Sequence, residues 1–559
     1  MKRLMLKKLN SVIDWFKMLS KKRFFPLLVA FGVFVIIYIT YLIFALQGPF
    51  PQITGTETAS ELATKFSEIA AQQDFSVLQG VMLFLILLEL GIAITMIKKR
   101  TMTVNRAIIF ILIAGFIMRT GYGIFTDGLM TRQHDLSVGS NTGNGHYGIT
   151  MFIYNNWALP ERLIKIVEGV PTWDLAGSYQ MYHPMLTHMT WAVFMHFNSL
   201  FMGTNIWVLY ESVRILSIFF SCMSLYFIYL TFKEFKIQGW PLVMATAIIA
   251  FSPVFYRLSA MTNNDPMAYF FIFLGILFTA KWLHKPTIGN IVVIALSIGL
   301  GMASKMTAAL LAFPVAGVFV YRLVVSIKQK KVLSLIPGFL LFAVIVFPIG
   351  LYFPIRSYLK YGQPLTYVWH NLNHHLLVTN TSVWDRYFSF PMDQLTHSLF
   401  EILWDDTPYG QDYNIYTTLM KSFLYGEFAF GNYILAGALM LFNLFFVVTM
   451  FLSMAFFLLN SLYQRKITNK EIIFFFGALG LTFFVSYIQF NNTYPYACTM
   501  DFRYVVVILL PIALLVAFAY EKTQTQTEHP RLKRFGAKYF PLLVAAFCLT
   551  SILYYISAA

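Results

Sequence analysis

Long stretches of the chain are almost entirely apolar and are separated by shorter polar segments. Runs such as 24–46 and 504–520 fall within the roughly 17–25 residues that a helix needs to cross a bilayer. The pattern predicts thirteen membrane-spanning helices, near residues 24–46, 77–96, 104–120, 205–232, 240–256, 266–283, 288–302, 306–324, 333–352, 432–460, 471–490, 504–520 and 539–557. We therefore expect an all-α, polytopic membrane protein.

The composition excludes a soluble enzyme. Of the 559 residues, 58% are hydrophobic and only 12% are charged, whereas soluble domains carry about 25% charged residues. The net charge of +16 would suggest a nucleic-acid partner in a soluble chain. In a membrane protein the position of the charges matters more than their sum, so nucleic acid is not an expected partner.

The distribution of basic residues predicts the topology. With a cytoplasmic N-terminus, most Lys and Arg residues lie in cytoplasmic segments or at the adjoining span ends, as the positive-inside rule requires. These segments are 1–23, 97–103, 233–239, 284–287, 325–332, 461–470 and 521–538. Most Asp and Glu residues lie on the opposite side. We expect a plasma-membrane protein with its C-terminus outside.

Two outer loops, 121–204 and 353–431, are longer than connections usually are, and functional residues often lie in such loops. Within the first, residues 146–159 and 184–202 have amphipathic patterns of helical length. We predict that they form interfacial helices along the membrane surface.

The first outer loop carries the candidate base. Asp127 and Asp135 lie near the membrane surface, together with Arg132 and His134. A carboxylate that deprotonates an acceptor hydroxyl must be reachable, partly desolvated and held by a donor. The alternative is that one carboxylate caps a turn or pairs with Arg132.

Histidines and tyrosines of the same loop are further substrate-site candidates. His146 is followed by Tyr147, and Tyr182 by His183. Imidazoles and carboxylates are a common metal-ligand set, which leaves a divalent metal open as an option, but no dense ligand spacing assigns a cofactor. The alternative is that these side chains anchor helices at the membrane interface.

Three cations lie at the predicted outer surface. Lys305 occupies an apolar hairpin, where a charge is costly unless it meets an anion such as a lipid phosphate. Arg356 and Arg503 are suited to bidentate phosphate contacts, although Arg503 can also pair locally with Asp501. Asp265 is a substrate-site candidate, for which the simpler interpretation is an N-cap before Pro266.

Several activities lose support from the sequence. We find no Walker loop and no GxSxG elbow, which argues against nucleotide-driven pumping and serine hydrolysis. The three cysteines are widely separated in the chain, so the sequence predicts no disulfide framework.

These motifs, in this order, resemble the GT-C glycosyltransferases, particularly the family that includes the protein O-mannosyltransferases and the lipid A aminoarabinose transferase. The similar elements are Gln133-His134-Asp135, Tyr182-His183-Pro184-Met185, Glu211 to Ser217 with Arg214, Asn264-Asp265-Pro266, Ser304-Lys305-Met306-Thr307, Arg356-Ser357-Tyr358 with Gly362-Gln363-Pro364, and Asp501-Phe502-Arg503-Tyr504. The resemblance covers roughly 104–520. It departs from the family where His134-Asp135 replaces an Asp-Glu pair and Met185 replaces a second proline.

The resemblance implies a GT-C-like fold and divides the chain into four parts. Residues 1–103 would be a basic N-terminal segment with two additional spans, and 104–352 the GT-C-like core with its catalytic loop at 121–204. Residues 353–431 would form the second outer loop, and 432–559 the C-terminal spans.

The resemblance also implies transfer of a sugar from a polyprenyl-phosphate-linked donor to an outer acceptor, which is an envelope polymer, a lipid or a protein. Lys305, Arg356 or Arg503 would bind the donor phosphate. Asp135, favoured over Asp127, would act as base in an inverting attack. Two alternatives remain: a flippase or transporter for lipid-linked sugars, and a ligase that transfers a whole lipid-linked glycan.

Overall fold

The computed structural model describes residues 25–45, 76–125, 146–156, 183–365, 378, 381–396, 412–426, 432–464, 470–525 and 529–557. Over these ranges the chain forms helices and connecting turns, and no β-sheet is present. The expected all-α architecture is therefore confirmed.

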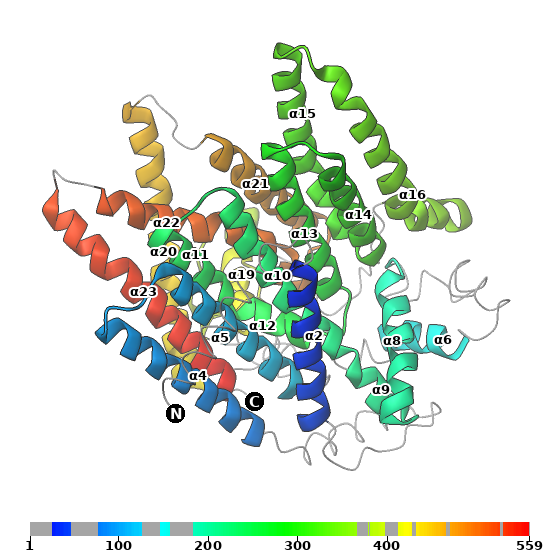
Figure 1. Ribbon diagram of the computed structural model, residues 1–559, viewed down its shortest axis with the longest axis horizontal. Helices are drawn as coiled ribbons and strands as arrows, with labels where there is room; N and C mark the ends of the chain where they lie inside the picture. Colours follow the sequence, from blue (N-terminus) through cyan, green and yellow to red (C-terminus); the bar gives the residue numbers. More distant parts are fainter. Residues whose placement is uncertain are drawn as a thin grey trace, which may run out of the picture.

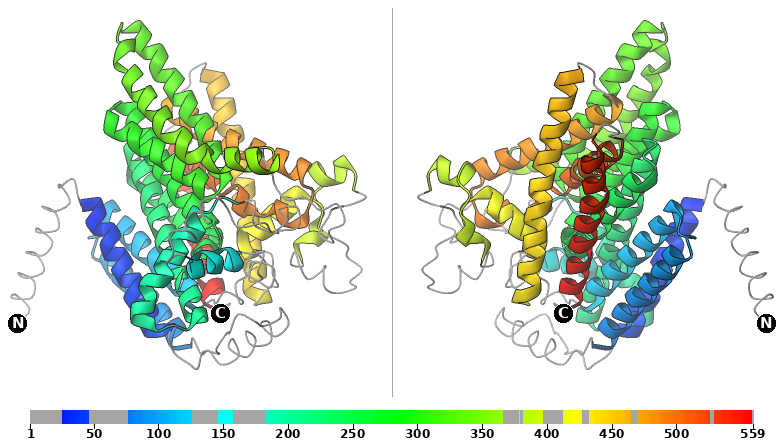
Figure 2. Two further views of the ribbon diagram at one scale, coloured as in Figure 1. Left: turned by 90° about the vertical axis from the view of Figure 1, so that its right-hand side faces the viewer. Right: turned by 90° about the vertical axis from the view of Figure 1, so that its left-hand side faces the viewer.

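The first half of the chain forms a series of helices, which are labelled in Figure 1. They are α2 (Phe25–Phe44), α4 (Ser76–Lys98), α5 (Val104–Phe125), α6 (His146–Asn156), α8 (Leu186–Met202), α9 (Ile206–Ser212), α10 (Arg214–Glu234), α11 (Gly239–Ala250), α12 (Pro253–Ala260) and α13 (Asp265–His284). Helix α10 is buried along most of its length. Helices α2 and α4 lie on one flank of the bundle, as Figure 2 shows.

The second half adds further spans and several short 3₁₀ helices. They are α14 (Ile288–Ser304), η2 (Met306–Leu311), α15 (Ala312–Lys328), η3 (Val332–Ser334), α16 (Ile336–Tyr361), α17 (Val383–Tyr387), η4 (Met392–Leu395), α19 (Ile415–Tyr425), α20 (Tyr433–Gln464), α21 (Lys470–Thr493), η5 (Ala497–Met500), η6 (Phe502–Tyr504), η7 (Val506–Ile508), α22 (Leu509–Gln524) and α23 (Pro530–Ser557).

Eleven helices in the described part of the chain are long and apolar enough to cross a membrane. The protein is a multi-pass membrane protein. Two of the thirteen predicted spans differ from the expected form: 240–256 is a pair of helices bent by 45°, and Ile288–Ser304 is a shorter apolar helix. Ser252 and Pro253 separate α11 from α12 because proline begins a helix well but cannot continue one.

Small residues allow the helices around α14 to approach closely. A Cβ added to Gly299 would lie 3.1 Å from Ile349 Cβ in α16, and one added to Gly275 of α13 would lie 3.2 Å from Ser297 Cβ. Close packing of this kind holds helices together in lipid, where the hydrophobic effect between helices is weak. This packing fixes the position of the C-terminal end of α14, and Lys305 is the next residue.

Both segments that we predict as interfacial form helices, namely α6 and α8. Neither is among the candidate spans. They pack through a small cluster of Ile149, Ile153 and Ala192, and the His196 ring forms a hydrogen bond with the Tyr154 carbonyl, 3.1 Å away. His146 lies in α6 and His188 in α8, and His183 shortly precedes α8.

Candidate functional site

Lys305 and Asp265 form a buried ion pair where α14 ends and α13 begins. Lys305 Nζ lies 2.6 Å from Asp265 Oδ1. The Asn264 side chain donates to the Ser304 carbonyl at 3.3 Å, which joins the two turns. Lys305 therefore has an internal counter-ion, as a buried charge requires.

The structure corrects the interpretation of Asp265 as an N-cap. Asn264 occupies the cap position and Asp265 is the first residue of α13, with no side-chain capping hydrogen bond. The Asp265 carboxylate is 3% exposed, and its Oδ2 has no hydrogen-bond partner among the described residues. A buried polar atom without a partner is costly, which marks this oxygen as one that a ligand can satisfy.

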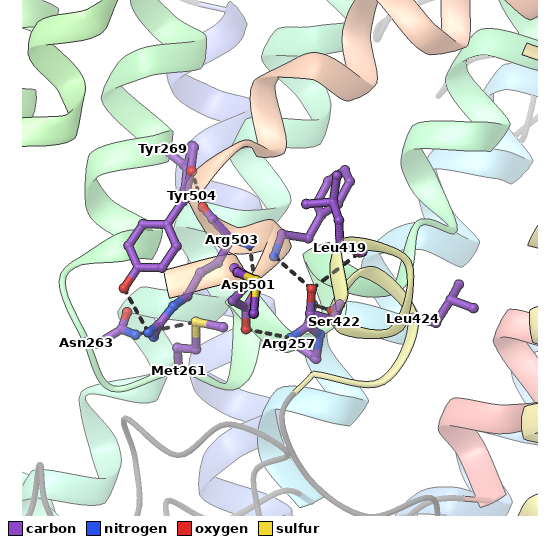
Figure 3. A network of polar contacts seen from close by, with 12 residues as sticks. Arg257, Met261, Asn263, Tyr269, Leu419, Ser422, Leu424, Asp501, Arg503 and Tyr504 are labelled. Atoms are coloured by element: carbon purple, nitrogen blue, oxygen red, sulfur yellow. Dashed lines mark hydrogen bonds and ion pairs between the residues drawn. The ribbon is translucent and has the colours of Figure 1, made fainter. Parts of the chain in front are cut away.

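Arg503 lies at the same Tyr504 ring as Lys305. The Arg503 guanidinium lies 4.9 Å from the centroid of the Tyr504 ring, and Lys305 Nζ lies 5.1 Å from the same centroid. Arg503 Nη2 also donates to the Tyr504 hydroxyl at 3.1 Å, as Figure 3 shows. The two predicted phosphate-binding cations therefore converge on one aromatic ring.

A second ion pair holds the segment that carries Arg503 (Figure 3). Arg257 Nη1 lies 3.7 Å from Asp501 Oδ2, and both side chains are buried. The backbone N–H of Arg503 donates to Asp501 Oδ1 at 2.7 Å. Asp501 therefore pairs with Arg257 and caps the turn at Arg503, which goes beyond the local pair considered from the sequence.

Helix α19 is attached to the same segment through one serine. Ser422 Oγ accepts a hydrogen bond from the Phe502 N–H at 2.9 Å, and the Ser422 carbonyl accepts one from Arg257 Nη2. A buried ion pair between Lys421 and Asp412, 2.6 Å apart, anchors the start of the helix. Sequence reasoning missed Arg257 and Ser422 because their partners are distant in the chain.

Three histidines of the first long loop gather into one cluster. His146 Nδ1 lies 2.8 Å from His188 Nε2, and the His146 and His183 rings stack with their centroids 5.9 Å apart. Burial lowers the pKa of His188 to about 3. Burial and then the charge of Lys305 lower the pKa of His183, and Lys305 also contributes to the lowered pKa of His146. Burial therefore disfavours the charged form of all three histidines, and the charge of Lys305 adds to this effect at His183 and His146.

Neutral imidazoles are potential metal ligands, but their arrangement does not complete a metal site here. Within the described ranges, no group of three or more His, Cys, Asp or Glu residues is placed to hold a metal ion. Tyr147 contacts Tyr210 edge-to-face, with ring centroids 4.9 Å apart. This contact packs α6 against α9, and a substrate role for Tyr147 stays a prediction.

The Glu211 to Arg214 motif supports the end of α5. Arg214 pairs with Glu211 and donates from Nη1 to the Gly123 carbonyl at 3.2 Å. Gly123 fits tightly there, since an added Cβ would lie 2.5 Å from Ile218 Cγ1. The motif fixes the point from which the first long loop leaves the bundle.

The remaining predicted residues are Arg356 and five residues outside the described ranges. Arg356 lies in α16, with its guanidinium over the rings of Phe353 and Tyr361 of the same helix. Five candidates lie outside the described residues: Asp127, Arg132, His134, Asp135 and Tyr182. Their roles stay predictions.

Comparison with known proteins gives one family match. Residues 183–352 match the family model described as dolichyl-phosphate-mannose-protein mannosyltransferase. The matched segment includes His183, Asp265 and Lys305. It confirms the resemblance to the GT-C glycosyltransferases that the motifs indicate, and it supports a glycosyltransferase activity.

Among solved structures, the chain is similar to the crystal structure of the Archaeoglobus fulgidus oligosaccharyltransferase in the apo form. The identity is 13% and the TM-score 0.43, over 81% of this chain and 56% of the other. The chain thus spans little more than half the length of that protein. No curated protein matches the chain.

Proposed function

Given its resemblance to the GT-C glycosyltransferases, we propose that this protein transfers a sugar from a polyprenyl-phosphate-linked donor to an acceptor at the outer face of the plasma membrane. The observation that carries the proposal is the convergence of Lys305 and Arg503 on the Tyr504 ring, beside the Asp265 carboxylate. Two cations brought together from distant segments in a buried site suit a phosphate group.

The order of the spans along the chain supports placing the candidate site residues on one side of the membrane. If the bent pair α11 and α12 and the shorter α14 each cross the membrane, the end of α5, the start of α13 and the ends of α14, α16 and α21 would all lie on one side. The opposite ends carry most of the basic residues. By the positive-inside rule, the face with Asp265, Lys305 and Arg503 is the outer one.

The phosphate would compete with Asp265 for Lys305. In the structure Lys305 is neutralised by Asp265 at 2.6 Å, so an arriving phosphate gains Lys305 only if the Asp265 carboxylate meets a donor in turn. A sugar hydroxyl next to the phosphate supplies such a donor, and Asp265 Oδ2 has an unfilled acceptor position. The site thus suits a sugar phosphate better than a bare phosphate.

The chemistry needs a base on the side of the sugar away from the phosphate. Asp135, or otherwise Asp127, would remove the proton from the acceptor hydroxyl. The acceptor oxygen then bonds to the anomeric carbon, and the bond from that carbon to the phosphate oxygen breaks with inversion. Lys305 and Arg503 would stabilise the charge that develops on the departing phosphate, which is the larger electrostatic contribution.

Transfer by purified protein in nanodiscs tests the proposal. A panel of labelled polyprenyl-phosphate-sugars is offered with a crude envelope acceptor, and the wild type is compared with Asp135→Asn, Asp127→Asn and a control, Asp393→Asn, at an exposed position. We expect Asp135→Asn to bind donor without forming product. Donor translocation without any product would instead favour a flippase, and equal transfer by every variant would overturn the assignment of the base.

A further inference from the structure

Residues 381–396 present an exposed apolar patch, formed by Val383, Trp384, Phe388, Phe390 and Met392 and here called the 383–392 patch. Trp384 and Phe388 are each 66% exposed, and their rings stack with centroids 5.3 Å apart. Exposed apolar patches on a protein surface mark interaction sites.

Several backbone groups of this segment are hydrogen-bonded within the protein. Asn414 Nδ2 donates to the carbonyls of Asp385 and Ser389, at 2.8 Å each. Ser382 Oγ accepts from the Asp385 N–H at 3.0 Å and so caps α17. These hydrogen bonds fix the backbone with its apolar side chains outward.

The patch is attached to the end of a membrane span. Arg386 Nη2 donates to the Asn491 carbonyl at 2.7 Å, and the Tyr387 hydroxyl donates to Asn492 Oδ1. Both partners lie in the last turn of α21, whose candidate span ends at Thr493. Figure 2 shows the yellow-green segment at the edge of the bundle beside the orange α21. The patch therefore lies at the level where this span leaves the apolar layer.

Lipid is the occupant that fits this position. Side chains of α21 itself, such as Leu481 and Val485, are exposed and apolar along the span, so the patch continues a lipid-facing surface. Tryptophan and other aromatic side chains are enriched at the boundary between acyl chains and headgroups. We propose that the 383–392 patch inserts into this boundary and binds the second long loop to the membrane on the side of the candidate site.

Spin labels placed on the patch test this inference, independently of any sugar transfer. In a background lacking Cys222, Cys498 and Cys548, single labels are introduced through Trp384→Cys or Phe388→Cys, and the full-length protein is placed in nanodiscs. Collision with oxygen, which concentrates in the bilayer, is compared with collision with a water-soluble nickel complex. We expect high oxygen and low nickel accessibility at both positions.

Two exposed positions calibrate the measurement. Leu452→Cys in the span of α20 reports a lipid environment, and Lys331→Cys, at an exposed and distant turn, reports water. Patch labels that behave like Lys331→Cys would overturn the proposal. Labels protected from both reagents would also overturn it, because a protein segment would then cover the patch. A label-free check is quenching by brominated lipids, which we expect to fall in Trp384→Phe relative to the wild type.

Discussion

Lys305 and Arg503 lie against the same ring, that of Tyr504, although they lie far apart in the chain. Lys305 follows the end of α14, and Arg503 lies in η6. Their convergence requires the packing of α13, α14 and the 501–504 turn, so it is a property of the fold and not of any local motif. The contribution of each cation to the proposed phosphate site can therefore be tested by single substitutions.

Replacing Lys305 with methionine should weaken donor binding. The loss of one charge-assisted contact to phosphate costs roughly 1.5–3 kcal/mol, or about 10- to 100-fold in affinity. The variant should also be less stable, because Asp265 is left as an unpaired buried carboxylate. Binding of a labelled donor and thermal unfolding, measured in nanodiscs, check the two effects.

The double variant Lys305→Met with Asp265→Asn separates these effects. It removes both charges, so stability should largely return while donor binding stays weak. Lys331→Gln, an exposed lysine at a distant turn, is the charge-matched control. Recovery of donor affinity together with stability would show that Lys305 serves the fold alone.

His188 should make stability depend on pH. Its pKa is lowered by burial to about 3, while an unfolded histidine titrates near 6.5. The unfolded state therefore binds more protons between these values, and the contribution is complete above pH 6.5 and is lost as pH falls toward 3. Between pH 6.5 and pH 5 the loss is roughly 2 kcal/mol.

The variant His188→Gln isolates this contribution, because its amide can stand near the position of Nε2 opposite His146. Between pH 6.5 and pH 5, the melting temperature of His188→Gln should fall less than that of the wild type. His529→Gln, at an exposed position, should leave the acid sensitivity unchanged. Identical pH profiles for the wild type and His188→Gln would show that His188 is not the neutral, buried group described.

Ser422→Ala should loosen the link between α19 and the turn of Arg503. The Phe502 N–H would lose its acceptor while buried, which costs about 1–3 kcal/mol. Ser334→Ala is a suitable control because Ser334 is exposed and bonds only within its own turn in the described structure. Equal melting temperatures for the two variants would contradict the link.

The helical architecture could be predicted because lipid admits few alternatives. A spanning segment must satisfy its own backbone hydrogen bonds and present apolar side chains, so each run near the predicted ranges became a helix. The predicted span 240–256 did not include the break at Ser252 and Pro253, although a proline within an apolar run is a local signal for such a break.

The site was only partly predictable, because its pairings are long-range. Lys305 and Asp265 were both candidates, but the sequence did not show that they pair with each other. The pair of Arg257 and Asp501 left no local signal at all. His188 did leave one: it shares a buried face of α8 with Trp191 and Met195, at helical spacing.

Gly123→Ala should be destabilising even though alanine favours helices. An added Cβ would lie 2.5 Å from Ile218 Cγ1 and 3.0 Å from the Ser259 carbonyl oxygen. Overpacking of this kind costs about 1–3 kcal/mol. Gly91→Ala in α4 is the matched control, since nothing lies within 4 Å of its added Cβ and the substitution should gain up to about 1 kcal/mol of helix propensity. A lower melting temperature for Gly123→Ala only is expected, whereas equal values would mean that α5 can shift without cost.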